Sequence, residues 1–293
     1  MRIRVPATTG NTGPSFDSTG LAFSLYAHFD FERIAPGMLE IAGCGAEFQT
    51  EENLAIRAFR AVERRIGAGT SGVRMRVDTE IPVSRGLGSS ATLIVAGAFA
   101  ANELYGAPLG RAQVLEIAAR MEGHPDNAAP ALYGGLCASA VLEDGQVLSV
   151  QYPVDDRVRF VALIPDFPLS TAEARSVLPD AVPRKDVVFN LSRAALLMRG
   201  MEAGDFDLLS VALDDRIHTP YRKSLIHGFD FVRKQALEAG ARALIISGSG
   251  PTLLALSEDP ERLARDIAER LESLEHRWRT LPLSVDREGA KIV

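Results

Sequence analysis

The segment Ile81-Pro82-Val83-Ser84-Arg85-Gly86-Leu87-Gly88-Ser89-Ser90-Ala91-Thr92 decides the fold, because it joins a glycine- and serine-rich turn to an apolar run. That run, Ala91 to Leu104, is rich in alanine and predicts a buried helix. Ser89 or Ser90 occupies the expected N-cap, where a hydroxyl can accept from the free N–H groups of the first turn. The glycines allow positive φ and close approach of a ligand. Because helix N-termini attract phosphate, the segment predicts a phosphate-binding loop.

A simpler interpretation of the same segment is a helix N-cap after a tight turn. Two other phosphate motifs are excluded. The chain has no Gly-Lys-Ser/Thr sequence, so there is no Walker A loop, and Ala91 replaces the third glycine of a dinucleotide-binding motif. The segment on its own therefore leaves a phosphate loop and an ordinary cap as alternatives.

The composition is that of a globular protein, with 293 residues, 46% of them hydrophobic and 24% charged. The net charge is 32 − 38 = −6, which disfavours nucleic acid or an anionic membrane as the main partner. No apolar run could span a bilayer, and the start of the chain lacks a signal-peptide core. Cys44 and Cys137 lie in glycine- and alanine-rich surroundings and predict small apolar residues rather than a disulfide or metal site. We therefore expect a cytoplasmic protein.

Periodic patterns predict a mixture of strands and helices along the chain. Ile3 and Val5 begin a strand, which is followed by a long polar loop, Pro6–Gly20, that could form a binding rim or simply turn the chain. The remaining elements expected are a strand over 21–31, a helix over 51–66, a strand over 73–77, a helix over 111–121, a hairpin over 136–152 turning at Asp144-Gly145, a strand over 158–164, a strand–turn–strand over 240–256 and a helix over 260–274. Pro153-Val154-Asp155-Asp156 marks a domain boundary.

A second polar cluster follows the helix over 111–121. The segment Glu122-Gly123-His124-Pro125-Asp126-Asn127-Ala128-Ala129-Pro130 gathers four polar or ionisable side chains within six residues. A helix C-terminal turn accounts for the glycine and the first proline. It does not require Glu122, His124, Asp126 and Asn127 together, so the cluster is a candidate for chemistry.

These segments resemble the motifs of a known family. Residues 82–91 match the Pro-x-x-x-Gly-Leu-Gly-Ser-Ser-Ala motif of the GHMP kinases, which include galactokinase, homoserine kinase and mevalonate kinase. Residues 122–130 resemble the homoserine kinase pattern Glu-Gly-His-Pro-Asp-Asn-x-x-Pro. Residues 6–17 resemble its N-terminal motif, from which Thr12 and Ser15 depart. Residues 170–179, 214–222 and 240–252 are similar to its later segments, so the resemblance covers nearly the whole chain.

The resemblance implies an ATP and Mg²⁺ site. The residues expected to bind ATP are Pro82, Arg85, Gly86, Leu87, Gly88, Ser89, Ser90 and Ala91, with Asn53 either touching adenine or capping its helix. Mg²⁺ takes oxygen ligands. By the motif match these are Ser90, with Ser89 as second choice, and Glu122, with Glu116 as the alternative.

The resemblance also implies an amino acid substrate. Asn11 and Asp17 would hold its ammonium group, and Arg175 and Arg222 its carboxylate, since a guanidinium fork donates two parallel hydrogen bonds. The other expected substrate contacts are His124, Asn127, Thr171 and Gly248.

The residues expected to act in catalysis are Ser90, Glu122, Asp126 and Asn127. Relatives such as mevalonate kinase place an aspartate base where this chain has Asn127, and an amide cannot serve as a base. Asp126 is adjacent. We therefore expect catalysis by positioning and charge stabilisation, with direct attack by the substrate hydroxyl.

The fold that the resemblance implies is α+β, with the site between two lobes. Residues 1–155 would form a lobe like ribosomal protein S5 domain 2, and residues 156–293 a ferredoxin-like lobe. The implied reaction is ATP-dependent phosphorylation of the L-homoserine side-chain hydroxyl to O-phospho-L-homoserine, in threonine biosynthesis. The alternatives are another GHMP small-molecule kinase and a non-catalytic ligand sensor. Whether the chain forms a homodimer stays open.

Overall fold

Alternation of apolar and polar residues builds the long strands of the first sheet. The computed structural model describes residues 1–293. It centres this sheet on β2 (Thr19–Ile34), flanked by β1 (Arg2–Gly10) and β4 (Gly72–Thr79), both antiparallel to it. Phe29 and Phe31 of β2 are buried, because alternate residues of a strand face the same side. The sheet is completed by β3 (Leu39–Ala42) beside β4, β5 (Leu136–Val141) beside β2, β6 (Val147–Tyr152) beside β5, and β11 (Lys291–Ile292) beside β1.

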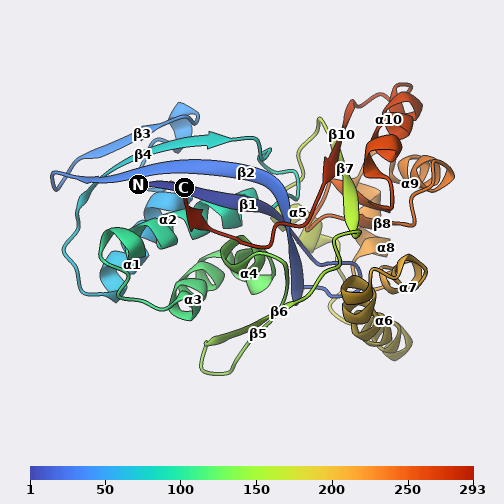
Figure 1. Cartoon of the computed structure of the whole chain (residues 1–293), viewed down its shortest axis with the longest axis horizontal. Coiled ribbons are helices and arrows are strands. Elements are labelled where there is room, and N and C mark those ends of the chain that lie inside the picture. The colour runs from blue at the N-terminus through green and yellow to red at the C-terminus, as the bar shows by residue number, and fades with distance from the viewer.

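Four helices cover one face of this sheet (Figure 1). They are α1 (Leu54–Arg65), α2 (Ser89–Leu104), α3 (Arg111–Glu122) and α4 (Pro125–Tyr133). The central helix, α2, is buried along most of its length, as its alanine-rich sequence predicts. Gly97 brings α2 against α1, since a Cβ there would lie 1.9 Å from the carbonyl oxygen of Ala55. Helices α1 and α2 are therefore packed tightly against each other.

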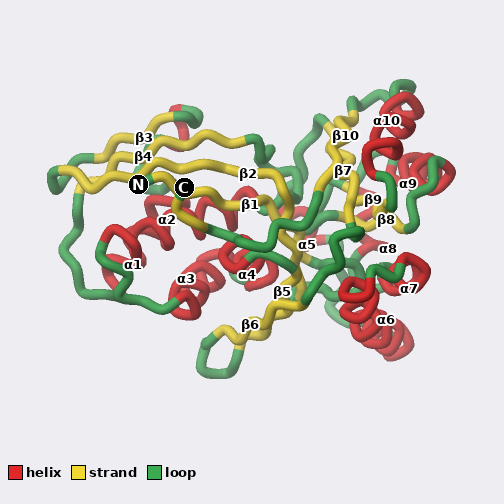
Figure 2. The backbone as a smooth tube through the Cα atoms, in the orientation of Figure 1, coloured by secondary structure: helices red, strands yellow, loops and turns green.

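The second sheet is smaller and antiparallel, in the order β10-β7-β9-β8 (Figure 2). Its strands are β7 (Arg159–Pro165), β8 (Ala243–Ile246), β9 (Leu253–Ser257) and β10 (Trp278–Leu283). Around it lie the helices α5 (Thr171–Ser176), α6 (Arg184–Ala203), α7 (Phe206–Ala212), α8 (Thr219–Arg222), α9 (Phe229–Glu238) and α10 (Pro260–Leu271). Short 3₁₀ turns occupy Ala46–Phe48 and Lys223–Leu225.

The two lobes share one hydrophobic core. Phe160 and Ala162 of β7 belong to the large cluster that also contains the core of the first sheet. Val161 and Leu163 point the other way, into a smaller cluster with α9 and α10. After β10 the chain returns to the first sheet, so the two termini lie close together (Figure 1). The α+β architecture is as predicted, whereas the boundary between residues 155 and 156 stays a prediction.

Two local predictions were wrong. The N-cap of α2 is Gly88, in the left-handed region at φ 71°, and it makes no side-chain capping bond; Ser89 and Ser90 are the first two helical residues. The loop expected over 6–20 is shorter, because β1 continues to Gly10 and β2 already starts at Thr19. Helices α4 to α9 were not predicted; α4, for example, is short and lacks a helical apolar period. No helix has the length and apolarity needed to cross a bilayer.

Candidate active site

A single cavity of about 600 Å³ collects most of the predicted site residues. Its walls come from both lobes: the phosphate loop (residues 82–91) and the junction of α3 and α4 on one side, and residues 169–175 and 248–249 on the other. Residues of the two lobes that are distant in sequence therefore face one shared space.

Glycines shape the phosphate loop where other parts of the chain come closest. Gly86 (φ 74°) lies against the turn after β8, where a Cβ would meet the carbonyl oxygen of Ser247 at 2.3 Å. A Cβ at Gly88 would lie 2.0 Å from Oγ1 of Thr8 in β1. Because the N-terminus of α2 lacks a side-chain cap, its first N–H groups remain available to an anion.

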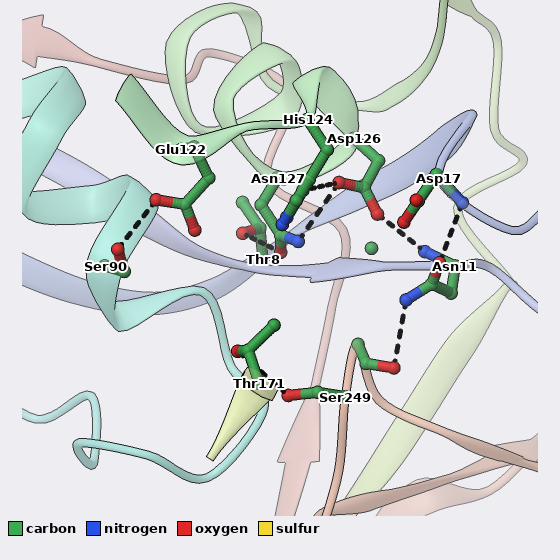
Figure 3. Close-up of polar contacts among 12 residues, drawn as sticks. Thr8, Asn11, Asp17, Ser90, Glu122, His124, Asp126, Asn127, Thr171 and Ser249 are labelled. Carbon is green, nitrogen blue, oxygen red and sulfur yellow. Dashed lines mark hydrogen bonds and ion pairs between the residues drawn. The ribbon is translucent and has the colours of Figure 1, made fainter. Parts of the chain in front are cut away.

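Ser90 and Glu122 meet on the cavity wall (Figure 3). Ser90 Oγ donates to Oε2 of Glu122 at 2.7 Å. Burial raises the pKa of the Glu122 carboxyl, and no Lys or Arg forms an ion pair with it. The predicted alternative, Glu116, is not among the residues that line the cavity. A hydroxyl and a half-buried carboxylate without a basic partner fit an Mg²⁺ ion, which prefers oxygen ligands.

A second set of potential metal ligands lies deeper in the site. Asp17, His124 and Asp126 each place a ligand atom within 4.8 Å of the others. Their carboxylates already have other partners, however: Asp17 is paired with Arg175, and Asp126 accepts from the backbone N–H of Asn11. These contacts favour Ser90 and Glu122 as the cation site.

Asn11 organises the substrate end of the cavity. Its backbone is left-handed, at φ 54°. Its side-chain Nδ2 donates to the carbonyl of Gly248 at 3.0 Å, and its Oδ1 accepts from the backbone N–H of Asp17 at 2.8 Å. Its own backbone N–H donates to Oδ2 of Asp126 at 3.1 Å. Asn11 thus connects three other predicted site residues (Figure 3).

The two predicted arginines are held in different ways. Arg175 donates from Nη2 to both carboxylate oxygens of Asp17, at 2.8 and 3.0 Å. Arg222 is 1% exposed and donates only to carbonyls, those of Ala174 at 3.1 Å and Gly248 at 3.0 Å. Burial lowers the pKa of Arg222, and the charge of Arg175 lowers it further. A buried guanidinium with no carboxylate partner favours an incoming anion.

The segment after α3 supplies three polar side chains. His124 Nδ1 makes a short contact with Oδ1 of Asp126, and the ring lines the cavity. Burial opposes a charged imidazole, but the hydrogen bond to Asp126 and the charges of Asp126, Glu122 and Asp17 together outweigh it and raise the pKa of His124. Asn127 also lines the cavity and accepts from Oγ1 of Thr8 at 2.9 Å. Asp126 is 1% exposed and is not among the lining residues, so its contacts hold its neighbours in place.

Three further predicted residues have contacts that bear on their roles. Asn53 caps α1, accepting from the backbone N–H of Ala55 at 2.9 Å, and it also lines the cavity. Its capping and adenine-contacting interpretations are therefore compatible. The Arg85 guanidinium donates to backbone carbonyls. The hydroxyl oxygens of Thr171 and Ser249 lie 3.5 Å apart.

Sequence reasoning missed some lining residues. Ser249 lines the cavity, and Thr8, which does not, donates to the lining residue Asn127; both stand inside segments that were matched to motifs but had received no role. The segment over 43–50 lines the end of the cavity near Asn53, and nothing in its composition signals a binding role. A Cβ at Gly43 would lie 1.9 Å from the carbonyl oxygen of Val77, so this segment packs tightly onto β4. Such a contact is visible only in the folded chain.

Comparison with known proteins gives full-length likenesses. The model of the GHMP kinases N terminal domain matches residues 53–135, and that of the GHMP kinases C terminal domain matches residues 197–274. A homoserine kinase of Clostridium botulinum is 39% identical over 293 residues, covering 100% of this chain and 98% of that protein. One of Microchaete diplosiphon is 43% identical, covering 99% and 96%. The crystal structure of a homoserine kinase from Cytophaga hutchinsonii has a TM-score of 0.88 at 27% identity, covering 100% of this chain and 97% of that one.

Proposed function

The chain belongs to the GHMP kinases, in the homoserine kinase family, and on that premise we propose that it phosphorylates the side-chain hydroxyl of L-homoserine with ATP. The products are ADP and O-phospho-L-homoserine, an intermediate for threonine biosynthesis. One observation carries this proposal: a single cavity joins the N-terminus of α2 to Arg175 and Arg222.

The ATP phosphates bind the phosphate loop. Gly86 and Gly88 bring backbone close to the ligand, and the N-terminus of α2 presents N–H groups to it. Asn53 and the segment over 43–50, at the same end of the cavity, contact the nucleoside. The γ-phosphate then lies toward Ser90 and Glu122.

Ser90 and Glu122 are the residues that would hold Mg²⁺. When bound, the ion would neutralise charge on the phosphate oxygens. The hydroxyl-to-carboxylate distance of 2.7 Å brings both oxygen ligands to one point of the wall. Because Glu122 is half-buried, its negative charge is only partly compensated by solvent, which favours binding of a cation.

Charged groups at the other end bind the zwitterionic part of L-homoserine. Arg222 has no carboxylate partner in the protein, and together with Arg175 it donates hydrogen bonds to the substrate carboxylate. Asp17 accepts the ammonium group. His124 and Asn127 line the space between these groups and the phosphate loop, so the side-chain hydroxyl extends toward the γ-phosphate.

Transfer needs no side chain acting as a base. The hydroxyl oxygen bonds to the γ-phosphorus while the bond from this phosphorus to the bridging oxygen of ADP breaks, and the hydroxyl proton passes to a phosphate oxygen. Asn127 is an amide, and the carboxylate of Asp126 is buried away from the cavity against Asn11 and His124. The site therefore acts by alignment and charge stabilisation.

The test measures ADP release in the presence of ATP and Mg²⁺ and compares five candidate substrates: L-homoserine, L-serine, L-threonine, mevalonate and galactose. Turnover confined to L-homoserine, with the phosphate ester identified by ³¹P NMR, is the expected result. Turnover with mevalonate or galactose alone would agree with the assignment to the GHMP kinases but would refute the carboxylate-binding role of Arg175 and Arg222. ATP binding without turnover of any of them would favour a ligand sensor.

A further inference from the structure

Arg85 uses its guanidinium to join the phosphate loop to the second lobe. Nε donates to the carbonyl of Pro165 at 3.0 Å, and Nη2 to that of Asp166 at 2.7 Å. Nη1 donates within the loop, to the carbonyls of Val83 at 3.1 Å and Ser84 at 3.4 Å. Four of the five N–H groups of this side chain therefore already have backbone acceptors.

The acceptors in the second lobe are themselves firmly held. Pro165 is the last residue of β7 and pairs with Trp278 of β10. The backbone N–H of Asp166 donates to the carbonyl of Arg277 at 3.0 Å. Its carboxylate accepts from Nδ1 of His276 at 3.0 Å and from the backbone N–H of Arg277 at 3.2 Å. Arg85 thus binds a corner that two strands fix in place.

The same part of the loop is also bound by the turn between β8 and β9. Ser247 Oγ donates to the carbonyl of Gly86 at 2.6 Å, and the backbone N–H of Thr252 donates to the carbonyl of Arg85 at 3.3 Å. A third connection comes from the backbone N–H of Leu169, which donates to the carbonyl of Ser84 at 3.2 Å, so the phosphate loop is bound to the second lobe at three places.

These connections reach the substrate end of the site. Gly248, next to Ser247 in that turn, accepts hydrogen bonds from Arg222 and from Asn11. The separation between the phosphate loop and the carboxylate-binding arginines thus depends on how the second lobe is attached to the loop. A misplacement of about 1 Å between reacting groups can cost about 100-fold in rate.

We propose that Arg85 is a positioning residue that clamps the phosphate loop to the second lobe and so aligns the γ-phosphate with the substrate hydroxyl. This proposal rests on the proposed function. It replaces the expectation that Arg85 binds ATP, since four of its five N–H groups already donate to carbonyls. A lysine cannot substitute, because one ammonium group lacks the planar fork that reaches Pro165 and Asp166 together.

The kinetic test compares Arg85→Ala and Arg85→Lys with wild type, with Arg74→Ala as the matched control. Arg74 is an exposed arginine that pairs with Glu32 and Glu40 on the first sheet. We expect kcat to fall about 100-fold in both Arg85 variants, while Kd for ATP and KM for L-homoserine stay within about threefold. A phosphate ligand would behave differently: Arg85→Ala would weaken ATP binding about tenfold or more and Arg85→Lys would restore it. Either that pattern or an unchanged kcat overturns the proposal.

A second measurement needs no turnover. Trp278 is the only tryptophan of the chain and pairs with Pro165, so its fluorescence reports on the clamped corner. Acrylamide should quench Trp278 more strongly in both Arg85 variants than in wild type, and equally in Arg74→Ala and wild type. Unchanged quenching in Arg85→Ala and Arg85→Lys overturns the clamp.

The two measurements separate the clamp from the reaction. Wild type that fails to phosphorylate L-homoserine would refute the proposed function, whereas the quenching comparison would still test the clamp. Arg85→Lys keeps the charge and most of the aliphatic stem, so it serves for both measurements if Arg85→Ala does not yield folded protein.

Discussion

Arg175 and Asp17, 158 positions apart in the chain, form an ion pair at the edge of the cavity, which Arg175 lines and Asp17 does not, with Nη2 of the arginine 2.8 and 3.0 Å from the two carboxylate oxygens. Both were predicted to bind opposite ends of a zwitterion. The pair therefore holds two binding groups together before an amino acid arrives. An entering substrate can exchange partners with it, its ammonium group going to Asp17 and its carboxylate to Arg175, so that no charge is left unpaired.

The exchange predicts how the site responds to loss of one charge. Asp17→Asn should raise KM for L-homoserine about 10- to 100-fold, because the substrate ammonium loses its charged partner, while Kd for ATP changes little. Asp186→Asn is the control, since Asp186 pairs with Arg216 outside the cavity. Steady-state kinetics with each substrate varied in turn would measure this. An unchanged KM in Asp17→Asn would contradict the ammonium role.

The contact between Ser90 and Glu122 predicts a metal-dependent defect. Glu122→Gln should lower kcat at least about 1000-fold at ordinary Mg²⁺ concentrations, since a neutral amide binds the ion more weakly, while the variant stays folded by circular dichroism. Glu116→Gln, from the same helix but away from the cavity wall, should retain turnover. Near-normal activity of Glu122→Gln together with loss of activity in Glu116→Gln would identify Glu116 as the residue that binds Mg²⁺.

The packing around Gly88 predicts that alanine substitutions at two glycines with similar backbone conformations destabilise the protein by different amounts. Gly88 (φ 71°) and Gly67 (φ 68°) are both left-handed, but a Cβ at Gly67 meets nothing within 4 Å. Gly67→Ala should therefore cost only the backbone term, about 1 kcal/mol. Gly88→Ala should cost about 3 kcal/mol or more, because its Cβ would lie 2.0 Å from Oγ1 of Thr8, which is held by a hydrogen bond to Asn127. Urea denaturation of both variants measures the difference, and equal losses would refute the packing argument.

Buried His218 predicts a pH dependence of stability. Burial lowers its pKa and outweighs the nearby charge of Asp215, while Arg222 lowers the pKa further. Because the folded pKa is depressed, the unfolded chain binds the proton first, so stability is lost as pH falls below about 6.5, the ordinary histidine value.

The measurement is the urea midpoint at several pH values for wild type and His218→Gln. The variant, which keeps a donor for the carbonyl of Gly13, should lose less stability than wild type on acidification through that range. Asp215 has a lowered pKa of its own and contributes only at lower pH, below the ordinary aspartate range. Identical pH dependence of wild type and His218→Gln would exclude His218 as the cause.

The sequence by itself determined the elements with a clear apolar period and the identity of the motifs. Alternation in β2, the apolar run of α2 and the polar cluster over 122–127 are each contained within a short stretch, so their periodicity and residue types are visible without a fold. The motif resemblance then led to a homoserine kinase, and the comparisons with known proteins agree.

Only the tertiary structure decided what these residues contact. The pairing of Asp17 with Arg175, the bonds of Asn11 to Gly248 and the carbonyl partners of Arg85 all join segments far apart in the chain. Such contacts depend on how the sheets and helices pack, and no local pattern encodes them. The N-cap of α2 was mispredicted for the same reason. The hydroxyl of Ser90 donates to Glu122 of another helix and does not cap α2. Gly88 is the N-cap residue, because Thr8 leaves no room for a side chain at that position.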